Sequence, residues 1–110
     1  MSKNEVKKIV KQFAELLKKH RIDFEHVYLY GSYASGKAKE HSDIDIAVVV
    51  EKVPRSFEAR MERKMQLWRL APKVDSRIEP YLLEQKDLKE DTLSIMGDEV
   101  REHGILIVSA

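Results

Sequence analysis

The sequence predicts a small α/β (α+β) domain in which helices pack mainly on one face of a mixed sheet. Helix-like and strand-like segments alternate along the 110 residues, which is typical of this class. Residues 43–50 end in a nearly continuous apolar run, as expected for a strand that is covered on both faces. No repeat, linker or low-complexity tract divides the chain. We therefore expect residues 1–110 to form a single domain.

The first element is expected to be an amphipathic helix. Ser2 and Glu5 have the spacing of a capping box. Apolar residues then recur on one helical face: Val6, Ile9, Val10, Phe13, Ala14 and Leu17. Basic residues at 18–21 suit the negative end of the helix dipole, so the helix should end there.

Four segments are expected to be strands. Residues 27–30 form a short β-branched and aromatic run that stops at Gly31, and residues 43–50 form a longer run that Pro54 closes. A third strand is predicted at residues 77–83. Pro80 interrupts it and favours an edge position or a bulge, because proline cannot donate a ladder hydrogen bond. Residues 105–108 form the last predicted strand.

Two further helices complete the prediction. Ser56 can cap a helix that ends before Pro72. Its large apolar residues share one face: Phe57, Met61, Met65 and Trp68. We interpret this face as core, and the alternative is a partner-binding face on an uncovered helix. The other helix is expected from about Asp91 to His103, followed by Gly104 as a terminator.

Composition narrows the function. Lys and Arg number 20 and Asp and Glu 19, a formal net charge of +1, whereas proteins that grip nucleic-acid backbone usually carry a larger basic excess. The absence of cysteine excludes disulfides and thiolate metal sites. No apolar run approaches the roughly 18 residues of a membrane span, and the first residues lack a signal-peptide core. We expect a cytoplasmic protein with no membrane contact and no direct nucleic-acid binding.

Two aspartates predict a metal site. Asp43 and Asp45 are two residues apart at a strand, so their side chains should project from the same face. Ionising two neighbouring carboxylates is costly unless a cation lies between them, and hard cations such as Mg²⁺ prefer oxygen ligands. The alternative is a turn with a solvent-facing Asp45. However, Asp45 lies between Ile44 and Ile46 in a very apolar strand, where an unpaired acid would be expensive.

A glycine turn precedes the acidic pair. Gly31 ends a strand, and residues 32–36 are small or turn-prone, so backbone amides and the Ser32 hydroxyl can form a phosphate cradle. The spacing fits neither Walker A nor the dinucleotide fingerprint. A phosphate loop after one strand and a metal clamp on the next could together hold a metal–triphosphate.

Gly31-Ser32, followed after a short helix by Ser42-Asp43-Ile44-Asp45, resembles the signature of the DNA polymerase beta nucleotidyltransferase superfamily. The length and the segment at residues 101–105 resemble its minimal nucleotidyltransferases, many of which are antitoxins encoded beside HEPN-domain ribonuclease toxins. The resemblance covers about residues 27–108. It implies a polymerase-beta-type core that transfers a nucleoside monophosphate, with ATP as the expected donor, to a hydroxyl acceptor on a partner HEPN protein.

The resemblance also implies a third acid on a later strand, for which Glu79 and Asp75 are the candidates. We favour Glu79, which lies within the predicted third strand, and expect Asp75 to cap the turn before it. Asp43, Asp45 and Glu79 would then hold two Mg²⁺ ions.

The resemblance further implies that the triphosphate is bound by Gly31, Ser32, Lys37 and Ser42. The family commonly has arginine where this chain has Ser35, and Lys37 could supply the missing positive charge. The alternative function is a non-catalytic antitoxin or nucleotide-binding module that acts by complex formation. The chain shows no additional acceptor-binding domain, so under either reading we expect a partner, in a homo- or hetero-oligomer.

Overall fold

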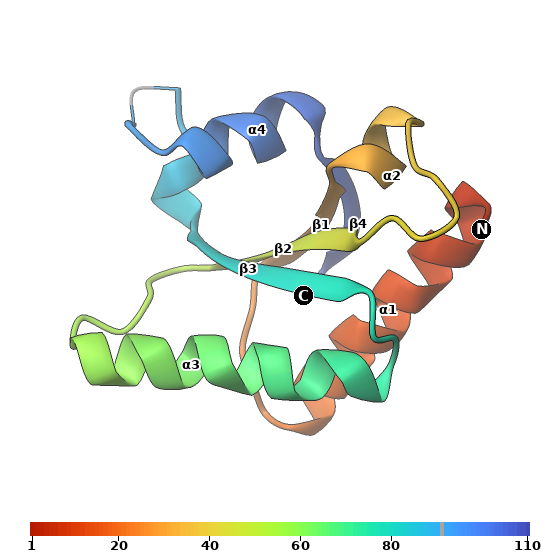
Figure 1. The fold of residues 1–110 in the computed structure, drawn as a ribbon. Helices are drawn as coiled ribbons and strands as arrows, with labels where there is room; N and C mark the ends of the chain where they lie inside the picture. The colour runs from red at the N-terminus through yellow and green to blue at the C-terminus, as the bar shows by residue number, and fades with distance from the viewer. Residues whose placement is uncertain (91) are drawn as a thin grey trace.

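A computed structural model describes residues 1–90 and 92–110, which form a four-stranded mixed sheet flanked by helices (Figure 1). The strands are β1 (His26–Tyr30), β2 (Ile44–Val50), β3 (Ile78–Glu84) and β4 (Ile105–Ser109), in the spatial order β3-β2-β1-β4. β1 is antiparallel to β2 and β4, whereas β2 and β3 are parallel. The predicted fold class is confirmed, and β3 is an edge strand, as Pro80 indicated.

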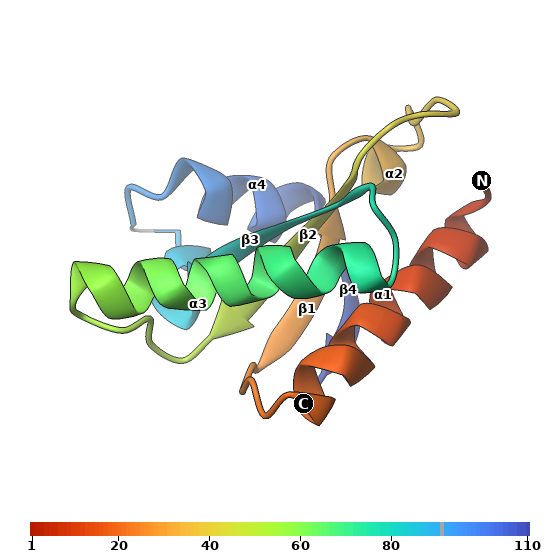
Figure 2. The ribbon, with the colours of Figure 1, turned by 60° about the horizontal axis from the view of Figure 1, so that its bottom comes forward.

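The two longest helices, α1 (Lys3–Lys19) and α3 (Phe57–Leu70), pack on one face of the sheet, and α4 (Ile95–His103) covers part of the other (Figure 2). A single turn, α2 (Ser32–Ser35), connects β1 to the loop before β2. Two 3₁₀ turns flank β3: η1 (Ala71–Lys73) and η2 (Gln85–Leu88). Among the described residues, no helix has both the length and the apolar character to cross a bilayer.

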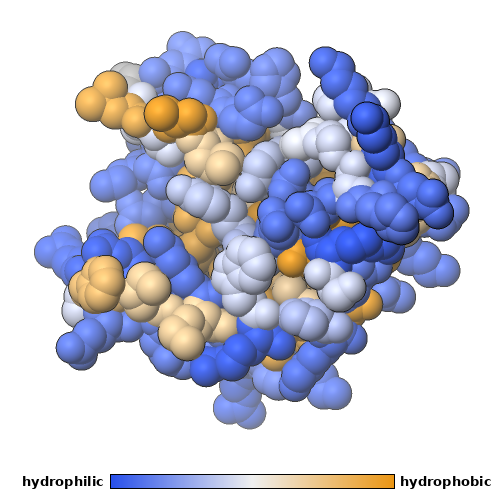
Figure 3. All heavy atoms as spheres, in the orientation of Figure 1, coloured by the Kyte–Doolittle hydropathy of each residue, from blue (hydrophilic) through white to orange (hydrophobic). Residues whose placement is uncertain are grey.

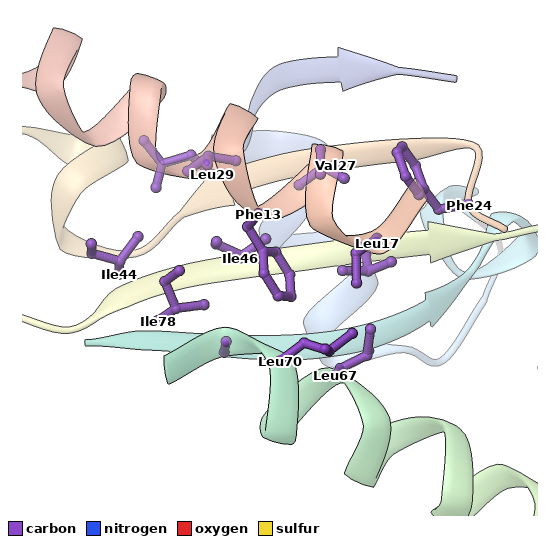
Figure 4. Packing of buried hydrophobic residues seen from close by; sticks show 14 of the residues in the cluster. Phe13, Leu17, Phe24, Val27, Leu29, Ile44, Ile46, Leu67, Leu70 and Ile78 are labelled. Atoms are coloured by element: carbon purple, nitrogen blue, oxygen red, sulfur yellow. The ribbon is translucent and has the colours of Figure 1, made fainter. Parts of the chain in front are cut away.

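The main core lies between the sheet and the helix pair α1 and α3. Figure 4 shows Phe13 and Leu17 of α1 and Leu67 and Leu70 of α3 pointing toward the sheet. α1 starts at the predicted capping box, in which the Glu5 N–H donates to the Ser2 hydroxyl at 3.1 Å. A smaller cluster on the opposite face joins the sheet to α4: Tyr30, Ala47, Val49, Leu83 and Val100. β2 is therefore covered on both faces, as its apolar run predicted.

The prediction of a core face on α3 was wrong. Phe57, Met61, Met65 and Trp68 are all exposed, and the helix instead buries Leu67 and Leu70. The reason is that helical spacing shows which residues share a face but not the direction in which that face points.

The last helix also begins later than predicted. The predicted start at Asp91 lies outside the described residues, and α4 begins at Ile95 because Ser94 caps it, accepting a hydrogen bond from the Gly97 N–H at 2.9 Å.

Candidate active site

Three carboxylates gather at the end of the sheet where β2 and β3 begin. Asp43 lies just before β2, Asp45 is its second residue, and Glu79 lies beside Asp45 in the parallel register. Residues paired across adjacent strands project from the same face, as do residues two apart on one strand. The backbone thus places Asp43, Asp45 and Glu79 on the face that α4 partly covers; we call these residues the acidic cluster.

Burial and mutual repulsion disfavour the charged forms of Asp45 and Glu79 in the acidic cluster. Partial burial and the charge of Asp43 raise the pKa of Asp45 above its ordinary value, although a hydrogen bond with Glu79 lowers it in part. Burial, the charges of both aspartates and hydrogen bonds with them raise the pKa of Glu79. Within residues 1–90 and 92–110, no ion pair joins a basic side chain to the cluster. The side chains that the structure describes thus leave this negative charge without a neutralising partner.

The glycine turn packs directly against the acidic cluster. Gly31 ends β1 with φ 73° and ψ −151°, a conformation essentially restricted to glycine. A Cβ atom there would overlap Oδ2 of Asp45 and lie 3.1 Å from its Cγ. Any other residue would strain the turn and displace the Asp45 carboxylate, so the two parts of the sequence signature are in physical contact.

Asp75, the other candidate for the third acid, is engaged elsewhere. Its carboxylate accepts hydrogen bonds from the backbone N–H of Arg77 at 2.9 Å and from the Arg77 guanidinium at 2.7 Å. These contacts hold the pKa of Asp75 below its ordinary value. Asp75 closes the turn that leads into β3, as expected, whereas Glu79 stands beside Asp45.

A family model described as "Polymerase beta, Nucleotidyltransferase" matches residues 11–109. The chain belongs to this family. A protein of Methanocaldococcus jannaschii named "Putative protein adenylyltransferase MJ0141" is 31% identical over 104 residues, which cover 92% of this chain and 97% of the relative. The chain is accordingly a nucleotidyltransferase.

Solved structures of similar proteins have the same fold. A "putative nucleotidyltransferase" from Sulfolobus solfataricus superposes with a TM-score of 0.67 over 97% of this chain and 83% of that one, at 18% identity. A chain from a structure described as a "toxin-antitoxin with AMP-PNP" is 25% identical, with a TM-score of 0.61 over 91% of this chain and 73% of that one.

The acidic cluster of this nucleotidyltransferase fits a divalent cation by charge and by ligand type. Mg²⁺ takes oxygen ligands and is commonly held by one or two carboxylates together with substrate phosphates, and clustered carboxylates with raised pKa values are stabilised by a cation. Among the described residues, no group of three His, Cys, Asp or Glu side chains is arranged to hold a metal ion. The parallel register sets Glu79 beside Asp45, and Asp43 lies two residues before Asp45.

The remaining residues predicted to bind triphosphate lie on and after α2. Ser32 is its first residue, and Lys37 is exposed beyond it. The Ser42 hydroxyl accepts the backbone N–H of Lys39 at 2.7 Å, so it closes the loop that leads to β2. Ser35, where the family commonly has arginine, donates its hydroxyl to the Ser32 carbonyl at 3.2 Å. Their roles in nucleotide binding stay predictions.

Sequence reasoning missed two tyrosines beside the acidic cluster. Tyr30 pairs with Asp45 across β1 and β2. Burial, together with the charge of Asp45, raises the pKa of Tyr30 to about 12, so its hydroxyl stays protonated at neutral pH. Tyr81 follows Glu79 by two residues on the same face of β3 and is partly exposed. The spacing of Tyr81 was visible in the sequence, but the pairing of Tyr30 required the strand register.

Proposed function

We propose that this nucleotidyltransferase transfers an adenylyl group from ATP to a hydroxyl group of a partner protein. The proposal rests on the contact between the acidic cluster and the glycine turn. This contact places negative charge, which no described side chain neutralises, beside a candidate phosphate loop. The M. jannaschii relative is named as an adenylyltransferase of proteins, and the toxin–antitoxin structure is described with AMP-PNP, an ATP analogue. We propose a cytoplasmic location because ATP is abundant there.

Each predicted site residue has a defined task in this proposal. Asp43, Asp45 and Glu79 would hold two Mg²⁺ ions, which when bound neutralise triphosphate charge and activate the attacking hydroxyl. Gly31, Ser32, Lys37 and Ser42 form the triphosphate-binding set, in which the absence of a side chain at Gly31 leaves room for the Asp45 carboxylate. These residue roles are sufficient for the reaction, because phosphoryl transfer depends mainly on positioning and charge stabilisation.

The reaction balances as a single displacement. The acceptor oxygen forms a bond to the α-phosphorus of ATP, the bond from that phosphorus to the bridging oxygen of the β-phosphate breaks, and pyrophosphate leaves. The hydroxyl proton passes to a base, for which Glu79 is our candidate. We propose a HEPN-domain protein as the acceptor, by the resemblance of this chain to minimal nucleotidyltransferases.

The test follows the fate of the α-phosphate. The purified chain is incubated with Mg²⁺, ATP labelled at the α-phosphate and the protein that co-purifies with it. We expect a labelled partner, no label from γ-labelled ATP, and a loss of roughly 100-fold or more in Asp45→Asn, as for removal of a main electrostatic contact. Asp75→Asn is the matched control, because Asp75 lies outside the acidic cluster, and it should retain labelling.

Equal labelling by the wild type and Asp45→Asn would contradict the proposed role of the acidic cluster. Calorimetry with Mg²⁺ and ATP separates the second candidate, a neutralising module without catalysis. The absence of ATP binding would favour that module.

A further inference from the structure

The outer face of α3 carries a line of large apolar side chains that none of the described residues covers. Their exposed fractions are 68% for Phe57, 39% for Met61, 50% for Met65 and 51% for Trp68. The spacing of four, four and three residues aligns them along one side of the helix. We call these four residues the α3 ridge. In Figure 3, pale orange side chains gather over α3 in the lower left of the view.

Such a ridge is unusual on the surface of a stable monomer. Contiguous exposed apolar patches mark interaction sites, tryptophan is enriched among the residues that dominate binding energy, and methionine adapts to varied partner shapes. α3 already buries Leu67 and Leu70 in the core, so the fold does not need the ridge for stability. Its composition indicates a docking surface for another molecule.

The charges around the ridge select the kind of partner. Residues 55–73 contain six basic side chains, Arg55, Arg60, Arg63, Lys64, Arg69 and Lys73, and two acidic ones, Glu58 and Glu62. A second copy of this chain docked ridge to ridge would bring two basic surfaces together, which is unfavourable. A partner with acidic side chains around an apolar face would instead be attracted.

A cavity beside the ridge strengthens this charge argument. It has a volume of about 510 Å³ and is lined by His20, Ile22, Gln66, Arg69, Leu70 and Lys73. Arg69 follows Met65 by four residues, so it flanks the ridge and also lines the cavity. Because the Arg69 guanidinium already pairs with Glu62 at 2.8 Å, Lys73 is the basic group with which this recess would meet an acidic side chain of a partner lying on α3.

The edge of the sheet next to α3 is poorly suited to binding an extended strand. Alternate residues of β3 bond to β2, which leaves the backbone groups of the others at the free edge. Pro80 has no N–H, the Ile78 N–H bonds to a carbonyl in the preceding turn at 3.2 Å, and the Glu84 N–H bonds to the Asp87 carboxylate at 3.0 Å. These features favour recognition of a partner through side chains, as in packing of one amphipathic helix on another.

We propose that the α3 ridge binds an amphipathic helix of a partner protein whose apolar face is bordered by aspartate or glutamate. This interaction goes beyond the proposed transfer reaction, because none of the ridge residues belongs to the acidic cluster. A binding assay tests it without ATP or metal, so the docking surface and the transfer reaction can fail separately.

The probes are two synthetic fluorescent peptides of about 18 residues, or five helical turns. Both have leucine at positions i, i+3, i+4 and i+7; one has glutamate at the flanking positions and the other lysine. Fluorescence anisotropy should show saturable binding of the glutamate peptide, about tenfold tighter than that of the lysine peptide. Met65→Glu should weaken binding by about tenfold or more, the effect expected for a central interface residue.

Leu106→Ser is the matched control, because Leu106 is also half exposed but lies on β4, at the opposite edge of the sheet from α3's neighbour β3. It should leave binding unchanged. Equal affinity for both peptides, no saturable binding, or equal binding by Met65→Glu would overturn the proposal. So would a stable homodimer in sedimentation analysis that Met65→Glu dissociates, since the ridge would then be an interface between copies.

Discussion

Replacing Gly31 with alanine tests the contact on which the candidate site depends. The φ of 73° and ψ of −151° at this position cost a residue with a Cβ atom about 1 to 3 kcal/mol. The new Cβ would also overlap the Asp45 carboxylate, and relieving such an overlap by shifting neighbours costs about 1 to 3 kcal/mol. We expect Gly31→Ala to lower the free energy of unfolding by about 2 to 5 kcal/mol, after a small gain from restricting the unfolded chain.

Gly36→Ala separates the two causes. Gly36 also has a positive φ, 80°, but its Cβ position has no neighbour within 4 Å. Its replacement should therefore cost only the backbone strain, about 1 kcal/mol. Urea denaturation of both variants measures the difference. A cycle that adds Asp45→Ala should give a favourable coupling of about 1 kcal/mol with Gly31→Ala. If Gly31→Ala is no less stable than Gly36→Ala, or if Asp45→Ala does not relieve it, the inferred contact is wrong.

Four other perturbations have expected outcomes that follow from the structure. With chelator present, Glu79→Gln should stabilise the protein at neutral pH. The reason is that the raised pKa of Glu79 makes the wild type lose stability as pH rises. In thermal melts, this gain in stability should vanish below the unfolded glutamate pKa of about 4.3. Asp75→Asn should instead destabilise the protein at neutral pH. The lowered pKa of Asp75 in the wild type stabilises the fold above the unfolded aspartate pKa, and this contribution is lost as pH falls. A parallel pH dependence of stability in the two variants would refute both assignments. On α3, Leu67→Ala should lower the free energy of unfolding by about 2 to 5 kcal/mol because Leu67 is buried. Met65→Ala should change it by less than about 0.5 kcal/mol. Equal losses of stability in urea denaturation would contradict the orientation of the helix. Gly97→Ala should destabilise α4 although alanine is the better helix former, because its Cβ would meet a carbonyl carbon of η2 at 2.7 Å; a rise in melting temperature would show that this packing is not tight.

The sequence predicts those elements whose apolar pattern has a single interpretation. The first helix has a capping box and one apolar face, and its five buried residues lie on that face. β2 is an apolar run too short for a helix of typical length, so its burial on both faces could be expected. Glu79 was placed beside the aspartates from the family resemblance and from its position within a strand, and the parallel register then placed it opposite Asp45.

Other features depend on contacts between segments distant in sequence, which composition and spacing do not contain. The approach of Gly31 to Asp45 follows from the packing of β1 against β2. The high pKa of Tyr30 arises from its burial and from charged groups that include Asp45 on β2 and Glu79 on β3. α3 illustrates the same limit: it carries two apolar stripes, and only the assembled sheet decides that Leu67 faces inward and Met65 outward.

The two functional features proposed for this chain are both places where folding alone would favour a different sequence. Apolar residues would be expected at the acidic cluster, at the start of a strand buried on both faces, and polar residues would be expected along the α3 ridge. Natural sequences agree with their fold at most levels, and departures concentrate where function requires them. The cluster concentrates negative charge that the described side chains do not neutralise, and the ridge exposes apolar surface that they do not cover. A cation and a partner protein would each remove one of these costs, so ligand binding should stabilise this small domain as well as enable its activity.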